Sequence, residues 1–303
     1  MVNATGPVKV AAFDIGSNSI KMTVAAVAAS GQVTEGASDM RTVRLGEGVD
    51  RTGRLADDRI AAALSALDEL AALATREGAT RMIGVATEAV RVAANGATFL
   101  DEVRRRTGIE ITLISGDQEA ALTYAGLATM RPLVGPVVMI DIGGASTEVV
   151  AGNGPEIVQS SSIPLGSGRL TDAFLPDDPP TSDQIAQARA AAGDLLDPLD
   201  LSRFRGSKLI LSGGTGTYLG TFMNQTDNLS RLEIEQALDR MTEINAEALA
   251  IVIGIPPLRA RVLPAGVAAA IECIDRLEPT SIAVSPSGLR IGLLQAAAKG
   301  HPL

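Results

Sequence analysis

Two copies of one short motif, 127 residues apart (141 − 14), constrain the fold of this chain more than any other feature. The hexapeptide DIGSNS at residues 14–19 recurs as DIGGAS at residues 141–146. Each copy follows an apolar, β-branched run and leads into another, which predicts a strand, a tight turn and a second strand. Two such hairpins at this spacing predict a molecule built from two related halves.

The residues of the two turns suit an anion, because small residues let backbone N–H groups approach it and polar side chains add donors. The candidate phosphate-binding residues are Ser17 and Asn18 in the first turn and Gly143, Gly144 and Ser146 in the second. The aspartates that begin the turns, Asp14 and Asp141, can each hold a metal ion or orient a water molecule. We therefore expect phosphate groups to be held from both sides of a cleft.

The composition argues against several other classes of function. The chain has 303 residues, of which 46% are hydrophobic and 20% charged, as expected of a folded protein large enough for two domains. A formal net charge of −9 and only 2% aromatic residues disfavour binding to nucleic acid or to an anionic membrane. The sequence opens without a secretion signal, and its single cysteine, Cys273, excludes an internal disulfide. We expect a cytoplasmic protein.

Strands and helices alternate in both halves, and this order predicts an α/β protein. Apolar residues at helical spacing predict helices over 55–77, 97–107, 118–130, 182–197, 230–253, 262–277 and 289–298. Strands are predicted at 8–13, 20–27, 82–86, 110–114, 137–140, 149–150, 208–211 and 281–284, with a short strand and turn at 41–48. Residues 1–6 are predicted to form a loose tail.

Two charged residues follow predicted strands, where α/β sheets place their ligands. Glu119 stands at the start of a predicted helix, so it is either a reactive carboxylate or a group that caps the helix. Arg91 has the fork geometry that suits phosphate oxygens, although a single arginine is more often a solvated surface group.

A further glycine-rich turn contains Gly213 and Gly214, between the strand at 208–211 and a helix. This order is suited to binding an anion, but the turn lacks the lysine of a Walker A motif. Cys273 lies in an apolar helical pattern, and His301 stands two residues from the last residue of the sequence, so neither is expected to form a covalent intermediate. Carboxylates, a metal ion and backbone donors remain for the chemistry.

Taken together, these segments resemble the exopolyphosphatase and guanosine-pentaphosphate phosphohydrolase family, within the actin-like and sugar-kinase ATPase superfamily. The resemblance covers nearly the whole chain and rests on eight segments in the family's order: 14–19, 43–48, 86–91 with Asn95, 114–120, 141–148, 164–171, 212–215 and 263–266. The chain departs from the family at Gln118, where a glutamate is common, and at Ile291, where Arg-Glu-Gly is the usual sequence.

The resemblance implies a fold of two ribonuclease-H-like domains with a cleft between them. The expected boundaries are 1–131 for the first domain and 132–288 for the second, with the final helix, 289–300, packing back on the first domain. By position, Glu119 matches the family's catalytic base, and Arg91 matches its phosphate-contacting arginine. Asp141 and Glu148, with Asp14, match acidic residues near a divalent metal ion.

The function implied is Mg²⁺-dependent hydrolysis of the terminal phosphate of inorganic polyphosphate, with Mn²⁺ as another option and a monovalent cation such as K⁺ as a further cofactor. Longer members carry an additional C-terminal helical region, so we expect this chain, which ends at Leu303, to favour short polyphosphates. The alternatives are a guanosine pentaphosphate (pppGpp) 5′-phosphohydrolase, a kinase, and a non-catalytic sensor of polyphosphate or guanosine polyphosphate. The expected assembly is a homodimer that binds neither nucleic acid nor membrane.

Overall fold

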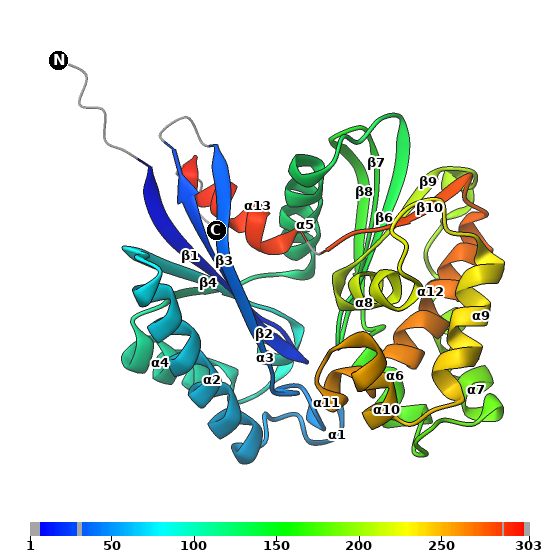
Figure 1. Cartoon of the computed structure of the whole chain (residues 1–303), viewed down its shortest axis with the longest axis horizontal. Coiled ribbons are helices and arrows are strands. Elements are labelled where there is room, and N and C mark those ends of the chain that lie inside the picture. The colour runs from blue at the N-terminus through cyan, green and yellow to red at the C-terminus, as the bar shows by residue number, and fades with distance from the viewer. Residues whose placement is uncertain (1–6, 29–31, 287, 300–303) are drawn as a thin grey trace. The chain divides into compact units, whose positions relative to one another are not determined.

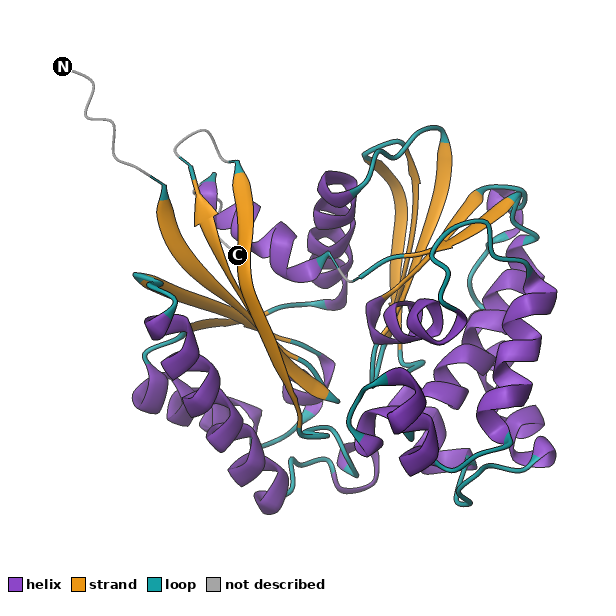
Figure 2. Cartoon of the chain, viewed as in Figure 1, coloured by secondary structure: helices purple, strands orange, loops and turns teal. Residues whose placement is uncertain are grey.

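The computed structural model describes residues 7–28, 32–286 and 288–299, which form two compact units (Figures 1 and 2). Unit 1 contains the chain up to Met130 together with the segment that begins at Gly288, and unit 2 runs from Arg131 to Ser287. The predicted tail at residues 1–6 lies outside the described residues. Each unit contains one mixed sheet of five strands.

The sheet of unit 1 has the strand order β3-β2-β1-β4-β5. Its first three strands form an antiparallel meander, and β4 and β5 run parallel to β1. The strands are β1 (Val8–Ile15), β2 (Ser19–Val27), β3 (Val33–Thr42), β4 (Arg81–Ala86) and β5 (Glu110–Leu113). The helices are α1 (Val49–Thr52), α2 (Asp57–Arg76), α3 (Glu88–Val92), α4 (Gly96–Thr107), α5 (Gly116–Met130) and α13 (Leu289–Ala298).

The sheet of unit 2 repeats the same order as β8-β7-β6-β9-β10. Its strands are β6 (Pro136–Ile142), β7 (Thr147–Asn153), β8 (Glu156–Ile163), β9 (Lys208–Ser212) and β10 (Ser281–Val284). Its helices are α6 (Ser167–Phe174), α7 (Ser182–Leu196), α8 (Gly213–Met223), α9 (Arg231–Thr242), α10 (Ala246–Ile253), α11 (Pro257–Ala260) and α12 (Leu263–Leu277), with a 3₁₀ turn, η1 (Ser202–Phe204). The repeated order confirms the predicted fold class, two ribonuclease-H-like α/β units.

Each face of the unit 1 sheet is buried under a different set of helices, because successive residues of a strand point to opposite faces. Phe13 and Ile15 pack with α2 and α4, whereas Val10 and Ala12 pack with α13. Asp14 therefore points to the face that carries α13. Helix α5 packs against α13 and contains Glu119 in its first turn.

Three glycines let the backbones of α5 and α13 touch. A Cβ atom added at Gly126 would lie 1.9 Å from the carbonyl oxygen of Gly288, and one added at Gly292 would lie 2.0 Å from that of Leu122. No side chain fits at these positions. The close contact fixes the last helix of the chain on unit 1.

Of two sequence predictions of secondary structure, one was confirmed and the other was wrong. The short strand and turn predicted at 41–48 correspond to the end of β3 and the turn after it, where the Val43 and Arg44 amides both donate to the Asn18 carbonyl, at 3.0 and 2.9 Å. The helix predicted at 230–253 is broken into α9 and α10, because Asn245 starts a new helix by accepting a hydrogen bond from the Ala248 amide at 2.9 Å.

Within the described residues, no single helix is both long and apolar enough to cross a membrane. A sharply bent pair, Ala246–Ile253 with Pro257–Leu277, reaches the required length and composition only when its two parts are taken together.

Substitution Gly126→Ala should destabilise the protein by about 1–3 kcal/mol, because the added methyl group forces two backbones apart. Thermal and urea unfolding will measure the loss. Ala121→Ser adds an atom on the exposed side of the same helix and should unfold with wild type. Equal stability of Gly126→Ala and wild type would contradict the close contact.

Burial raises the pKa of the Cys273 thiol to about 12, so the folded protein should resist thiol reagents at pH 8. We expect labelling by a chromogenic disulfide only as the protein unfolds in urea. Stopped-flow absorbance with and without denaturant measures both rates, and rapid labelling of the native protein would contradict the buried position.

Candidate active site

The backbone carbonyl groups of the first turn, between β1 and β2, accept hydrogen bonds from the segment that follows β3. The Ser17 carbonyl accepts a hydrogen bond from the Gly46 amide at 2.8 Å, and the Asn18 carbonyl accepts the two amides described above. Asn18 is only 5% exposed, and its side-chain Nδ2 has no hydrogen-bond partner among the described residues. A buried donor of this kind calls for an acceptor, and a phosphate oxygen would satisfy it.

Asp14 has a counter-ion within its own unit. It stands opposite Lys21 across β1 and β2, and the Lys21 ammonium lies 3.7 Å from the Asp14 carboxylate. The pair is largely buried, so the lysine offsets much of the charge of this aspartate.

Arg91 is anchored rather than solvated. Its Nη1 donates to the Ile114 carbonyl at 2.7 Å, and its Nη2 pairs with the Glu88 carboxylate one helical turn earlier. A guanidinium group has five N–H donors, so these two contacts fix its orientation and leave donors for an anion.

Glu119 lies in the first turn of α5 but is not the residue that caps this helix. Ser115 and Gln118 form a reciprocal capping box, in which the Ser115 amide donates to Gln118 Oε1 at 2.8 Å and the Gln118 amide donates to Ser115 Oγ at 3.2 Å. Gln118 can therefore replace the glutamate that is common in the resembled family, since both side chains accept this bond. Glu119 follows the box directly and is half-buried.

The strand order of unit 1 brings these groups to one edge of its sheet. Asp14 lies near the end of β1, Arg91 follows β4, and Glu119 follows β5. Because β1, β4 and β5 are parallel neighbours, their carboxyl ends meet at the edge where α/β proteins bind ligands.

In unit 2, two acidic residues face each other across β6 and β7. Asp141 and Glu148 are directly paired in the register of these strands, and they are 8% and 2% exposed. Like charges placed directly opposite each other are destabilising. Asp141 Oδ2 accepts a hydrogen bond from Ser212 Oγ at 3.1 Å, and Glu148 Oε1 accepts one from Ser162 Oγ at 2.8 Å.

The two units differ at one equivalent position. Lys21 and Glu148 each stand seven residues after the aspartate of their motif and opposite it in the sheet. Asp14 therefore faces a cation, whereas Asp141 faces a second anion. In unit 2 the cation that acts on Asp141 comes from another element, the buried guanidinium of Arg259.

This pair of carboxylates fits Mg²⁺. Among the described residues no three His, Cys, Asp or Glu side chains gather into one cluster. Mg²⁺ keeps several water ligands and is usually bound through one or two carboxylates together with substrate phosphates. Two buried, opposed carboxylates are therefore a suitable donor set for this ion.

Gly213 and Gly214 leave room for neighbouring charged groups. Gly213 has φ +75°, and a Cβ atom there would lie 2.4 Å from Asp141 Oδ1. A Cβ atom at Gly214 would overlap the guanidinium of Arg259. These glycines are therefore required for Asp141 and Arg259 to occupy their positions.

Arg259 is a candidate site residue that the sequence did not indicate. It is 6% exposed, and its guanidinium lies 5.1 Å from the centre of the Tyr218 ring. Burial lowers the pKa of Arg259, while Tyr218 and the negative charge of Asp141 act in the opposite direction. The only local signal is its place in the short helix that begins at Pro257, and this does not reveal burial.

The second turn repeats the construction of the first. The Gly143 carbonyl accepts the amide and hydroxyl of Ser167, at 2.9 and 3.0 Å, and the Gly144 carbonyl accepts the Gly168 amide at 2.9 Å. The Gly143 amide donates to the Ser146 carbonyl at 2.9 Å. The start of α6 thus holds this turn by its carbonyl groups.

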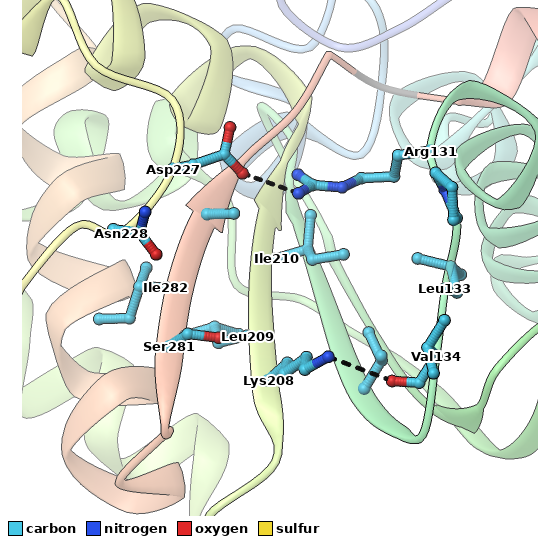
Figure 3. A pocket seen from close by; sticks show the side chains of 13 residues that line it. Arg131, Leu133, Val134, Lys208, Leu209, Ile210, Asp227, Asn228, Ser281 and Ile282 are labelled. Atoms are coloured by element: carbon cyan, nitrogen blue, oxygen red, sulfur yellow. Dashed lines mark hydrogen bonds and ion pairs between the residues drawn. The ribbon is translucent and has the colours of Figure 1, made fainter.

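A separate cavity of about 310 Å³ lies beside the first residues of unit 2 (Figure 3). Ile210 and Leu133 line its middle, the Arg131–Asp227 ion pair (2.7 Å) crosses one end, and Lys208 lies at the other. None of the site residues predicted from the sequence lines it.

Comparison with known proteins assigns the chain to the same family that its motifs resemble. The model of the Ppx/GppA phosphatase family matches residues 23–301. This chain belongs to that family. It is 30% identical to "Exopolyphosphatase 1" of Mycobacterium tuberculosis over 302 residues, which cover 93% of this chain and 86% of that protein.

Two solved structures are similar throughout. The Aquifex aeolicus member of the Ppx/GppA family is 30% identical, with a TM-score of 0.75 over 97% of this chain and 98% of that one. An exopolyphosphatase from Cytophaga hutchinsonii has a TM-score of 0.88 at 22% identity, over 97% of this chain and 99% of that one. The second similarity supports the fold alone.

Substitution Gly213→Ala should lower the rate of phosphate release from polyphosphate by at least tenfold, because the methyl group displaces the Asp141 carboxylate as well as straining the backbone. Gly206→Ala is the matched control: Gly206 has the same φ of +75°, with no atom within 4 Å of its added Cβ. Both variants should lose similar backbone stability, and only Gly213→Ala should lose turnover. Equal activities would contradict the contact with Asp141.

Proposed function

We propose that this protein is an exopolyphosphatase, which hydrolyses the terminal phosphoanhydride bond of inorganic polyphosphate. The observation that carries the proposal is the buried, opposed pair Asp141 and Glu148 in a chain of the Ppx/GppA family. The similar mycobacterial protein is named an exopolyphosphatase. Passive binding of a phosphate chain does not require two carboxylates, which repel it unless a cation intervenes, so the pair favours an enzyme over a sensor.

Unit 1 supplies the proton-transfer group in this proposal. Glu119 orients the attacking water and accepts its proton, because its half-buried carboxylate lies in the first turn of α5, where the helix dipole favours negative charge. Arg91, held by Ile114 and Glu88, directs its remaining N–H donors to the phosphoryl oxygens on which charge develops. Asn18 and Ser17 bind a phosphate through the first turn.

Unit 2 supplies the groups that hold a divalent cation and further phosphate oxygens. Asp141 and Glu148 would bind Mg²⁺, or Mn²⁺, which neutralises charge on the phosphate chain when bound. The turn with Gly143, Gly144 and Ser146 contributes donors to the phosphates, and the Gly213-Gly214 turn leaves room beside Asp141. Asp14 is assigned a supporting role, because Lys21 already provides its counter-charge.

Substitution Glu119→Gln should lower turnover by about 10²–10⁴ while leaving the fold intact, because the amide cannot accept the proton of water. The measurement is phosphate release with Mg²⁺ from short polyphosphate, long polyphosphate and guanosine pentaphosphate. Asp117→Asn, an exposed carboxylate two residues earlier in the same helix, is the control and should retain activity.

Each outcome has a distinct meaning. Release from polyphosphate that disappears in Glu119→Gln supports the enzyme and its base. Release from guanosine pentaphosphate alone assigns the protein to nucleotide hydrolysis. Binding without release from any substrate would contradict the proposed enzyme. The two polyphosphates test chain-length preference, and the homodimer, the K⁺ requirement and the cytoplasmic location remain predictions.

A further inference from the structure

Four polar side chains form a single row across the sheet of unit 2. In the strand register, Ser162 on β8 is opposite Glu148 on β7, Glu148 is opposite Asp141 on β6, and Asp141 is opposite Ser212 on β9. Residues paired in this way project from the same face of a sheet. In order across the sheet, the row therefore consists of a hydroxyl, two carboxylates and a second hydroxyl.

Each hydroxyl donates a hydrogen bond to the carboxylate beside it. Ser162 Oγ lies 2.8 Å from Glu148 Oε1, and Ser212 Oγ lies 3.1 Å from Asp141 Oδ2. Ser212 has a second acceptor, the Pro286 carbonyl, at the longer distance of 3.4 Å. Each hydrogen bond fixes one oxygen of its carboxylate and so restricts rotation of the side chain.

The Ser212-Gly213 pair restrains both oxygens of Asp141. Ser212 donates to Oδ2, while Oδ1 lies against Gly213, where an added Cβ atom would come within 2.4 Å. Ser212 is fully buried, so water does not compete for its hydroxyl. Glu148 has a longer side chain with one more rotatable bond, and Ser162 restrains its end from the neighbouring strand.

We propose that Ser162 and Ser212 are positioning residues that hold Glu148 and Asp141 in the arrangement that receives a divalent cation. The inference deepens the proposed function and rests on it for the identity of the reaction. The serines act through the hydroxyl hydrogen bond and not through the space that they fill. Neither serine is expected to contact the substrate.

The test compares Ser162→Ala and Ser212→Ala with Ser161→Ala. Ser161 is the matched control, because it is opposite Val149 and therefore projects from the other face of β8. Mg²⁺ binding is measured by titration calorimetry without substrate, and phosphate release from polyphosphate is measured over a range of Mg²⁺ concentrations. Thermal unfolding establishes that each variant is folded.

We expect each alanine variant of the row to bind Mg²⁺ about 10–100-fold more weakly than wild type, as for other residues that orient metal ligands. Their kcat should fall at low Mg²⁺ and recover as Mg²⁺ is raised, with little change in KM for polyphosphate. Ser162→Thr, which restores the hydroxyl on a partly exposed strand, should recover most of the Mg²⁺ affinity. Ser161→Ala should match wild type.

Wild-type Mg²⁺ affinity in both Ser162→Ala and Ser212→Ala would overturn the inference, as would failure of the wild type to bind Mg²⁺. Loss of affinity in Ser162→Thr equal to that in Ser162→Ala would also overturn it, because the hydroxyl would then not be the active group. A wild type that binds Mg²⁺ but releases no phosphate would refute the proposed function instead. The binding comparison would still decide the role of the serines.

Discussion

The direct opposition of Asp141 and Glu148 in neighbouring strands is the constraint on which the proposed site depends. Two unit charges about 5 Å apart repel each other by roughly 3 kcal/mol at an effective dielectric constant of 20. Hydrogen bonds to charged groups contribute about 1.5–3 kcal/mol each, so the bonds from Ser162 and Ser212 can offset much of this cost. In the proposed site, a divalent cation would offset the remaining repulsion.

The duplicated scaffold explains how the two units come to differ in chemistry. Both units contain the same strand order. In both, the carbonyl groups of the turn accept hydrogen bonds from a segment elsewhere in the same unit. The residue seven positions after the aspartate then sets the local charge, with Lys21 in unit 1 and Glu148 in unit 2. One register position thus pairs the aspartate with a lysine in unit 1 and with a second carboxylate in unit 2.

Much of the fold was predictable, because its strong signals are local. The two hairpin motifs indicated duplication, and helices such as α2 and α12 have apolar residues at clear helical spacing. β3 was not predicted as it stands, since it is a largely polar edge strand whose pairing with β2 is decided by the sheet. The break between α9 and α10 lies in a sequence that reads as one helix, and the Asn245 cap decides it.

The sequence by itself determined the two turns and the family to which the chain belongs, and it indicated Asp141, Glu148 and Glu119 as candidate site residues. These depend on short runs of residues in fixed order, which are legible without coordinates. Only the tertiary structure revealed Ser162, Ser212 and Arg259 as their neighbours. Ser212 and Asp141 are 71 residues apart in the chain, and the register of β6 and β9 brings them together. Strand register and burial arise from the packing of the whole sheet, so no local pattern of residues could specify these contacts.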